Sequence, residues 1–187
     1  MKITGGEGEE KTSSSSLSAK LAARLRLHVD PSIGLSNKVV ERYTFLICGD
    51  KFKGVYSADR IPLRLAARPS FTIIVNLELM EERGRESGGH FVTVVGGEEE
   101  IYYIDPYGLP SAVPQVNRFL ELCRRPIYQN FRQIQDLDSI YCGMYAILFA
   151  RFFDREKSPF KMSFLRSNLK RNDRRCVEYL RRMIKIK

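Results

Sequence analysis

The sequence predicts one α+β domain in which a small mixed β-sheet is packed between helices. Segments rich in β-branched and aromatic residues are typical of strands, and they occur at 71–79, 90–95, 100–105 and, as a short candidate, 130–135. Helical patterns of apolar residues occupy other stretches: 17–27, 111–125, the stretch after residue 142, and 172–185. No internal repeat is present, and 187 residues with 43% hydrophobic content suit a single core.

The first residues of the chain differ in composition from the rest. Residues 1–16 combine Gly, Ser, Glu and Lys with almost no apolar side chains, so they cannot bury enough surface to offset the entropy lost on ordering. We therefore expect a flexible tail at 1–16 and a folded domain at 17–187. The domain begins with an amphipathic helix at 17–27, and Pro31 ends it.

Charge and cysteine content narrow the possible functions. The formal net charge is +9, and the densest basic stretch is "LKRNDRRCVEYLRRMIKIK" at 169–187. Such a surface attracts polyanions, most often nucleic acid, although the solvated face of a basic helix has the same composition. The four cysteines are widely spaced without a CxxC pair, and the chain has only two histidines. Neither a zinc site nor a disulfide framework is therefore predicted.

The chain also lacks the sequence features of membrane and secreted proteins. It has no run of about 18 apolar residues, the length that a membrane-spanning helix needs. The N-terminal stretch "MKITGGEGEEKTSSSSLSAK" lacks the apolar region of a signal peptide. We expect a soluble intracellular protein without a membrane partner.

A histidine and an aspartate lie on neighbouring predicted strands. A two-residue turn at Gly97-Glu98 would set His90 directly opposite Asp105, at a Cβ distance of about 4.5 to 5.5 Å that suits an imidazole–carboxylate hydrogen bond. A turn centred on Gly96-Gly97 would instead leave the two residues on one face in diagonal positions. The pair could also be a chance polar contact between strands.

Cys142 precedes a nearly continuous apolar helix and follows a polar, turn-prone stretch. A helix N-terminus and a neighbouring imidazolium both lower the pKa of a thiol, so Cys142 with His90 would form an activated nucleophile and its base. An oxyanion needs hydrogen-bond donors, which the Cys142 N–H and a side-chain amide of Gln133 or Gln135 could supply. A cysteine in this position is otherwise an ordinary buried residue.

Three motifs carry a family resemblance. The stretches "GRESGGHF" (84–91), "YYIDPYG" (102–108) and "IQDLDSIYCGMY" (134–145) resemble the histidine, acidic and glutamine–cysteine segments of the adenovirus maturation proteases, cysteine endopeptidases related to the ubiquitin-like protein proteases. Two more stretches look related: "FKGVYSADRIP" (52–62) and "LKRNDRRCVEYLRR" (169–182). The resemblance implies a single-domain cysteine protease fold with the nucleophile at the N-terminus of a buried helix. It implies four roles: Cys142 as nucleophile, His90 as base, Asp105 as its orienting acid, and Gln135 as oxyanion donor.

The chain departs from the family at two positions. Phe91 stands where tryptophan is typical, which would preserve a flat aromatic wall, and Asp105 stands where glutamate is often found. The N-terminal tail has no familiar counterpart. These departures suggest a member from a virophage or a related large DNA virus.

The resemblance also implies substrates and partners. We expect a viral maturation endopeptidase that cleaves capsid or core precursors at Gly-Gly-X sites, acts as a monomer, and is packaged in the virion after synthesis in a host nucleus or cytoplasmic virus factory. The tail contains such a site, "ITGG" at 3–6, so self-cleavage after Gly6 is expected. DNA, a viral peptide, or both could activate the enzyme without a metal or small-molecule cofactor. Cys123 falls where the adenovirus enzyme links its peptide, yet a buried helix residue is the favoured interpretation.

Two alternatives remain at this stage. A deubiquitinase-like or ubiquitin-like protein protease would use the same triad and also cleave after Gly-Gly. A nucleic-acid-binding structural protein with a vestigial site would account for the basic charge, but it would not require His90, Asp105, Gln135 and Cys142 to persist together.

Overall fold

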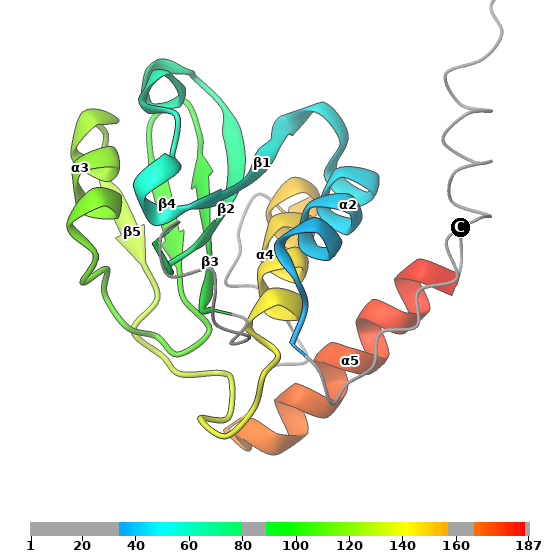
Figure 1. Ribbon diagram of the computed structural model, residues 1–187. Helices are drawn as coiled ribbons and strands as arrows, with labels where there is room; N and C mark the ends of the chain where they lie inside the picture. The colour runs from blue at the N-terminus through cyan, green and yellow to red at the C-terminus, as the bar shows by residue number, and fades with distance from the viewer. Residues whose placement is uncertain (1–33, 80–88, 157–166, 186–187) are drawn as a thin grey trace, which may run out of the picture.

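The computed structural model describes residues 34–79, 89–156 and 167–185 (Figure 1). The α-helices in these ranges are α2 (Asn37–Cys48), α3 (Pro114–Leu122), α4 (Cys142–Glu156) and α5 (Leu169–Lys185). The strands are β1 (Phe52–Ser57), β2 (Phe71–Asn76), β3 (Phe91–Gly96), β4 (Ile101–Ile104) and β5 (Ile127–Gln129). Three short 3₁₀ helices, η1 (Gly49–Lys51), η2 (Ala58–Arg60) and η3 (Leu63–Ala67), lie between the earlier elements. The predicted tail at 1–16 and helix at 17–27 lie outside the described residues.

The strands form one mixed sheet in the order β1-β2-β3-β4-β5. The two outer pairs, β1 with β2 and β4 with β5, are parallel, and the inner pairs are antiparallel. Helices α2 and α4 lie over one face of this sheet and α3 over the other, while α5 packs on the far side of α4 (Figure 1). The predicted α+β fold with a mixed sheet between helices is therefore confirmed.

Both faces of the sheet are buried, which explains why its central strands are mostly apolar. Alternate residues of a strand point to opposite faces. Ile74 and Val95 belong to the core shared with α2, α4 and α5, whereas Ile73 and Val94 belong to the core under α3 and η3. Every residue of β2 and β3 is buried. Burial of this kind contributes roughly 1.5–3 kcal/mol for each large apolar side chain.

Helix α2 and strand β1 were not among the predicted elements. The buried residues of α2 include Val40, Tyr43 and Thr44, a helical spacing, but Phe45 is 54% exposed and obscures the apolar stripe. In β1, Gly54 has a φ of 131° and the pairing with β2 shifts at this point. A strand interrupted by such a bulge has no clean alternation in its sequence.

Three element boundaries also differ from the prediction. Helix α3 begins at Pro114, a residue favoured at the first helical position, and ends at Leu122. Helix α5 begins earlier than expected, at Leu169, because the Asn168 side chain accepts a hydrogen bond from the Arg171 N–H (2.9 Å) and caps the helix. The short strand β5 lies at 127–129 rather than at 130–135. Among the described helices, none has the length and apolar content to cross a bilayer.

The hairpin between β3 and β4 has a longer loop than predicted. Gly96 pairs with Ile101 and Thr93 with Ile104, so four residues, 97–100, form the loop, closed by a 2.8 Å bond from the Gly97 N–H to the Glu100 carbonyl. Gly96 stays in the ladder because it pairs with Phe71 of β2, whose ring lies where a Cβ on residue 96 would be, 2.4 Å away. The predicted direct pairing of His90 with Asp105 is therefore wrong by two residues.

Arg125 ties the segment after α3 to the loops at this end of the sheet. Its guanidinium donates to the carbonyls of Ala66 (3.1 Å), Arg68 (3.0 Å) and Pro69 (3.1 Å), and also to that of Gly97. The group also lies over the Phe71 ring, 5.8 Å from its centroid. A planar fork with five donors suits this set of acceptors better than a single ammonium group.

We predict that Arg125→Lys lowers the free energy of unfolding by about 1–3 kcal/mol, because a lysine cannot reach all these carbonyls and some lose their partner. Urea denaturation would measure the loss. Arg124→Lys is the matched control because that neighbouring side chain is exposed. Equal stability of the two variants would contradict the prediction.

Candidate active site

Cys142 is the first residue of α4, and its side chain is buried near the ends of β3 and β4. The N–H groups in the first turn of a helix have no partner within the helix. The thiol lies 3.6 Å from the Gly89 carbonyl, to which it donates. Gly89 itself lies against Asn76, where a Cβ on residue 89 would be 2.1 Å from the Asn76 Oδ1. The predicted position of Cys142, at the tip of a buried helix, matches the structure.

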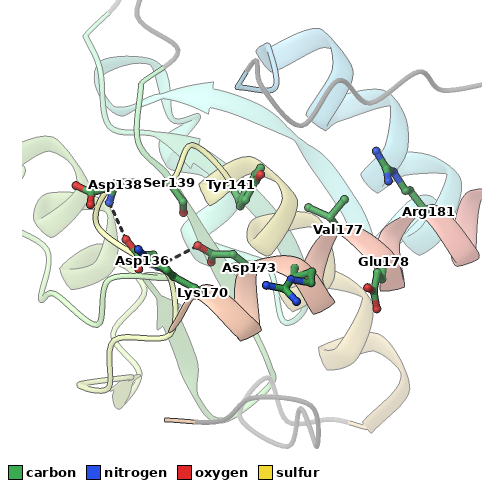
Figure 2. A pocket seen from close by; sticks show the side chains of 10 residues that line it. Asp136, Asp138, Ser139, Tyr141, Lys170, Asp173, Val177, Glu178 and Arg181 are labelled. Atoms are coloured by element: carbon green, nitrogen blue, oxygen red, sulfur yellow. Dashed lines mark hydrogen bonds between the residues drawn. The ribbon is translucent and has the colours of Figure 1, made fainter. Parts of the chain in front are cut away.

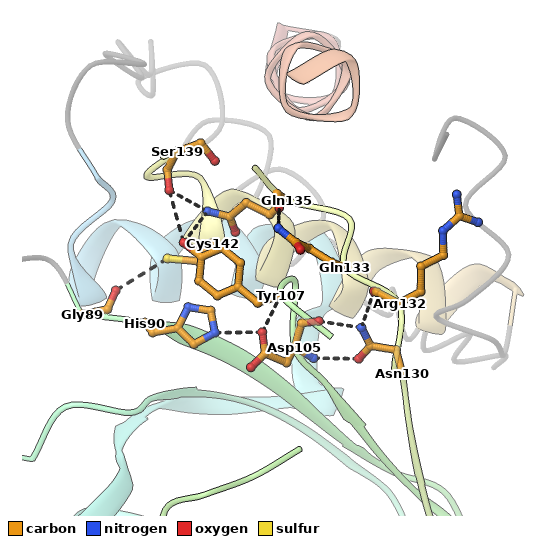
Figure 3. Close-up of polar contacts among 10 residues, drawn as sticks. All are labelled: Gly89, His90, Asp105, Tyr107, Asn130, Arg132, Gln133, Gln135, Ser139 and Cys142. Atoms are coloured by element: carbon orange, nitrogen blue, oxygen red, sulfur yellow. Dashed lines mark hydrogen bonds and ion pairs between the residues drawn. The ribbon is translucent and has the colours of Figure 1, made fainter. Parts of the chain in front are cut away.

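His90 and Asp105 meet just beyond the paired parts of β3 and β4. His90 Nε2 lies 2.9 Å from Asp105 Oδ1, although the two residues are diagonal rather than directly opposite (Figure 3). The shift of two residues in the hairpin register keeps each side chain on its predicted face. The histidine–aspartate pair is therefore present in a diagonal arrangement, which results from a four-residue loop that matches neither of the two predicted turns.

Asp105 is held firmly by its other contacts. The carboxylate is 2% exposed and also accepts the Tyr107 N–H at Oδ1 (2.6 Å). The Asn130 side chain accepts the Asp105 N–H (2.8 Å) and donates to the Asp105 carbonyl (2.6 Å). Gly108, with a φ of 70°, closes the following turn by donating to the same carbonyl (2.9 Å). These bonds fix the carboxylate before any partner approaches the histidine.

The surroundings of His90 favour its charged form. Burial by itself lowers the pKa of His90, but hydrogen bonds to Asp105 and Cys142, together with their negative charges, outweigh it and raise the pKa to about 9. Asp105 engages Nε2, which leaves Nδ1 for the cysteine. The structure thus brings Cys142, His90 and Asp105 into one chain of interactions, in which an imidazolium faces the sulfur.

Gln135 lies beside this chain, fully buried. Its Nε2 donates to the Ser139 carbonyl (2.8 Å) and, more weakly, to the Tyr107 hydroxyl (3.3 Å), while its Oε1 is buried without a protein partner. Gln133 instead donates to the backbone carbonyl of Gln135 (2.8 Å). Of the two glutamines considered, Gln135 is the one whose side chain enters the site, but both of its N–H groups are engaged. Its role as oxyanion donor stays a prediction.

The segment that carries Gln135 is anchored from two sides. The N–H groups of Ile134 and Gln135 both donate to the Pro106 carbonyl, at 2.9 and 3.1 Å. On the other side, the Asn172 side chain of α5 donates to the Ile134 carbonyl (3.0 Å), and Asp173 accepts the Asp136 N–H (3.3 Å). This segment is therefore fixed between the Asp105 turn and α5.

Asp173 is a buried carboxylate with several donors around it. The Tyr145 hydroxyl of α4 lies 2.9 Å from its Oδ1 and 3.2 Å from the Ile134 carbonyl. Burial raises the pKa of Asp173, while hydrogen bonds from Ser139, Tyr145 and the Asp136 backbone oppose that effect. In the sequence, the stretch 169–182 stood out only as part of the family resemblance, and the role of Asp173 was not predicted. The signal that could have indicated this role is a polar Asn-Asp pair on an otherwise apolar helix face.

A hollow of about 450 Å³ opens between α5 and the segment 136–141 (Figure 2). Acidic groups come from both walls, including Asp136, Asp138 and Glu178, and basic groups come from α5, including Lys170 and Arg181. His90 is not among the residues that line this hollow. The mixed charge gives it no preference for one sign of ligand.

Two site residues were missed by the sequence reasoning, and one expectation was wrong. Tyr107 and Asn130 both contact Asp105, and neither was assigned a role. Phe91 was expected to form an aromatic wall of the site, but it is 1% exposed and belongs to the core with α4. The aromatic ring that contacts the His90 imidazole is that of Tyr107, at a centroid distance of 4.7 Å.

We predict that the His90 imidazole titrates with a pKa near 9, as measured by NMR of ¹⁵N-labelled histidine, and that Asp105→Asn lowers that pKa. Because the pKa is raised on folding, the stabilisation from charged His90 is complete below about pH 6.5 and disappears as the pH rises through about 9. Asp138→Asn, which changes an exposed acid, is the control. A wild-type pKa near 6.5 would overturn the prediction.

The sequence matches no protein-family model and no curated protein, but solved structures resemble the fold. A crystal structure of the ASFV pS273R protease superposes with a TM-score of 0.55 at 14% identity, covering 78% of this chain and 67% of that one. Two further structures are less similar. A selenomethionine structure of the ASFV pS273R protease has a TM-score of 0.41 at 16% identity, covering 58% of this chain and 43% of that one. The structure of AvrA delL154 with IP6 and CoA has a TM-score of 0.42 at 15% identity, covering 78% of this chain and 62% of that one. The first similarity shows that this chain shares its fold with the ASFV pS273R protease.

Proposed function

We propose that this protein is a cysteine endopeptidase in which Cys142, His90 and Asp105 form the catalytic triad. The observation that carries the proposal is the convergence of a helix-terminal thiol, an imidazole with a raised pKa, and a buried carboxylate 2.9 Å from that imidazole. The fold shared with a cysteine protease supports it. The family resemblance in three motifs around the same residues supports it independently.

In the proposed reaction, His90 already carries the Cys142 proton as an imidazolium, and the sulfur attacks the carbonyl carbon of the scissile peptide bond. As the tetrahedral intermediate collapses, the C–N bond breaks, the His90 imidazolium gives its proton to the leaving amine, and a thioester remains on Cys142. His90 then takes a proton from water, which attacks the thioester and releases the acid with the free thiol. Asp105 keeps the imidazole oriented throughout.

The oxyanion of both tetrahedral intermediates needs donors. The backbone N–H groups at the start of α4 have no partner within the helix and are candidates. Gln135 is the side-chain candidate. Its hydrogen bond to the Tyr107 hydroxyl is longer (3.3 Å) than its bond to the Ser139 carbonyl (2.8 Å), so an oxyanion would replace the bond to Tyr107 more easily.

We assign the substrate class from the resemblance: viral capsid or core precursor polypeptides cleaved at Gly-Gly-X sites. Glycines at the scissile bond let the chain enter a narrow site. Large apolar side chains are exposed on segments that also carry site residues, as in Leu109, Leu137 and Ile140. Such side chains suit contact with the apolar residue that lies two positions before the pair of glycines.

DNA is the partner that the charge distribution favours. Five basic residues on α5 have exposed side chains, namely Lys170, Arg171, Arg174, Arg181 and Arg182. Phosphate contacts by such residues release counterions and make binding sensitive to salt. A virion enzyme acting as a monomer along packaged DNA would fit this surface. A peptide linked through Cys123 is not proposed, because that thiol is buried and donates to the Phe119 carbonyl (3.4 Å).

We predict that the full chain cleaves a fluorogenic Ile-Thr-Gly-Gly peptide and that Cys142→Ala lowers the rate by about a thousandfold or more. Cys123→Ala is the matched control and keeps activity, since that residue lies outside the site. Duplex DNA raises the rate at low salt and loses this effect at high salt. Cleavage that survives Cys142→Ala would refute the triad, and labelling by a ubiquitin-like C-terminal probe without cleavage of capsid precursors would favour the ubiquitin-like protease alternative.

A second prediction concerns the segment "ITGG" at 3–6. Wild-type protein is expected to lose residues 1–6, because the sequence matches the proposed cleavage pattern, whereas Cys142→Ala retains them. Intact-mass analysis measures the difference, and a Gly6→Val variant with intact Cys142 serves as the control for site specificity. Identical N-termini in wild type and Cys142→Ala would contradict the prediction.

A further inference from the structure

Tyr107 lies opposite His90 in the hairpin, where the predicted register placed Asp105. Continuing the observed register of β3 and β4 beyond the Thr93–Ile104 pair places residue 107 opposite His90. The Tyr107 ring stacks on the His90 imidazole with a centroid distance of 4.7 Å and an angle of 19° between the planes. The histidine thus has one aromatic face and, through Nε2, one carboxylate partner.

Tyr107 also contacts the other members of the site. Its N–H donates to Asp105 Oδ1 (2.6 Å), and its hydroxyl accepts from Gln135 Nε2 (3.3 Å) and donates to the Ser139 carbonyl (3.4 Å). Burial, and then the negative charge at Cys142, raise the pKa of Tyr107, which keeps the hydroxyl protonated as a donor. One half-buried side chain therefore joins the proposed base to the proposed oxyanion donor (Figure 3).

We propose that Tyr107 is a positioning residue for the proteolytic reaction, acting on His90 through its ring and on Gln135 through its hydroxyl. The proposal rests on the proposed cysteine protease function. The ring and the hydroxyl of Tyr107 have different proposed roles, so separate variants can test each of them.

The ring limits how the imidazole can rotate. His90 must keep Nε2 on Asp105 while Nδ1 exchanges a proton with Cys142, and a parallel ring on one face opposes rotation out of that plane. An aromatic face also stabilises a cation stacked on it, so the imidazolium benefits more than the neutral imidazole.

The hydroxyl holds the Gln135 amide until an oxyanion forms. When one Gln135 N–H turns to the oxyanion, the Tyr107 hydroxyl still has the Ser139 carbonyl as its acceptor, so no buried hydroxyl is left without a bond. The exchange of one weak hydrogen bond for a charge-assisted bond favours the intermediate over the resting state.

The test compares Tyr107→Phe, which keeps the ring, with Tyr107→Leu, which removes it. With the fluorogenic Ile-Thr-Gly-Gly peptide, Tyr107→Phe is expected to lower kcat about 5- to 10-fold with KM unchanged, because the Gln135 amide is no longer held in position for the oxyanion. Tyr107→Leu lowers kcat further. ¹⁵N-histidine NMR is recorded in a His28→Gln background so that one histidine remains. The pKa of His90 is expected to equal the wild-type value in Tyr107→Phe and to be lower in Tyr107→Leu.

Two further measurements make the test specific. Tyr128→Phe removes a hydroxyl from a half-exposed tyrosine on β5 and leaves both readouts unchanged. In a Gln135→Met background, adding Tyr107→Phe has no further effect on kcat if the hydroxyl acts through Gln135. A full additional loss there, or a Tyr107→Leu variant that titrates and turns over like wild type, overturns the proposal.

The NMR titration separates this proposal from the proposed function. If the wild-type protein cleaves no peptide but His90 titrates lower only in Tyr107→Leu, the protease assignment fails while the effect of the ring on His90 stands. If peptide cleavage depends on Cys142 but both Tyr107 variants titrate and turn over like wild type, the positioning role fails and the protease assignment stands.

Discussion

The pairing of His90 with the buried carboxylate of Asp105 is the interaction on which the rest of the site depends. A charge that is 2% exposed is costly unless partners surround it. His90 and the Tyr107 N–H both bind Asp105 Oδ1, and Asn130 binds the backbone on both sides of the same residue. Each of these partners comes from a different turn or strand end. The contacts of one residue, Asp105, therefore fix β3, β4 and the chain after β5 relative to one another.

Much of this arrangement follows from the alternation of side chains along strands. His90 and Asp105 could be placed on one face from the sequence because the predicted two-residue loop and the observed four-residue loop differ by an even number of residues, whereas a shift by one residue would have put them on opposite faces. The exact register could not be obtained in the same way. It depends on Gly96 remaining paired with Phe71, and that contact involves β2, outside the hairpin. Tyr107 was missed for this reason, since its place opposite His90 exists only in the correct register.

The parts that the sequence could not predict depend on contacts between distant segments. Cys142 at a helix start and Gln135 upstream were recognisable from local chemistry and from resemblance. The anchoring of the Gln135 segment by Asn172 and Asp173 was not, because polar residues on a basic helix usually face solvent. Helix α2 was missed because an exposed aromatic residue, Phe45, masks the periodic burial of its other side chains.

The anchoring by α5 has a consequence for the order in which the site is completed. Asn172 and Asp173 bind backbone groups of Ile134 and Asp136, residues made 37 or 38 positions earlier in the chain. During synthesis, these hydrogen bonds cannot form until α5 has left the ribosome. The sheet, α3 and the start of α4 at Cys142 can already have assembled by then, since folding can begin from the N-terminal side. The segment beside Cys142 therefore receives its hydrogen bonds from α5 after the sheet has formed, so Cys142 is synthesised well before its surroundings are complete.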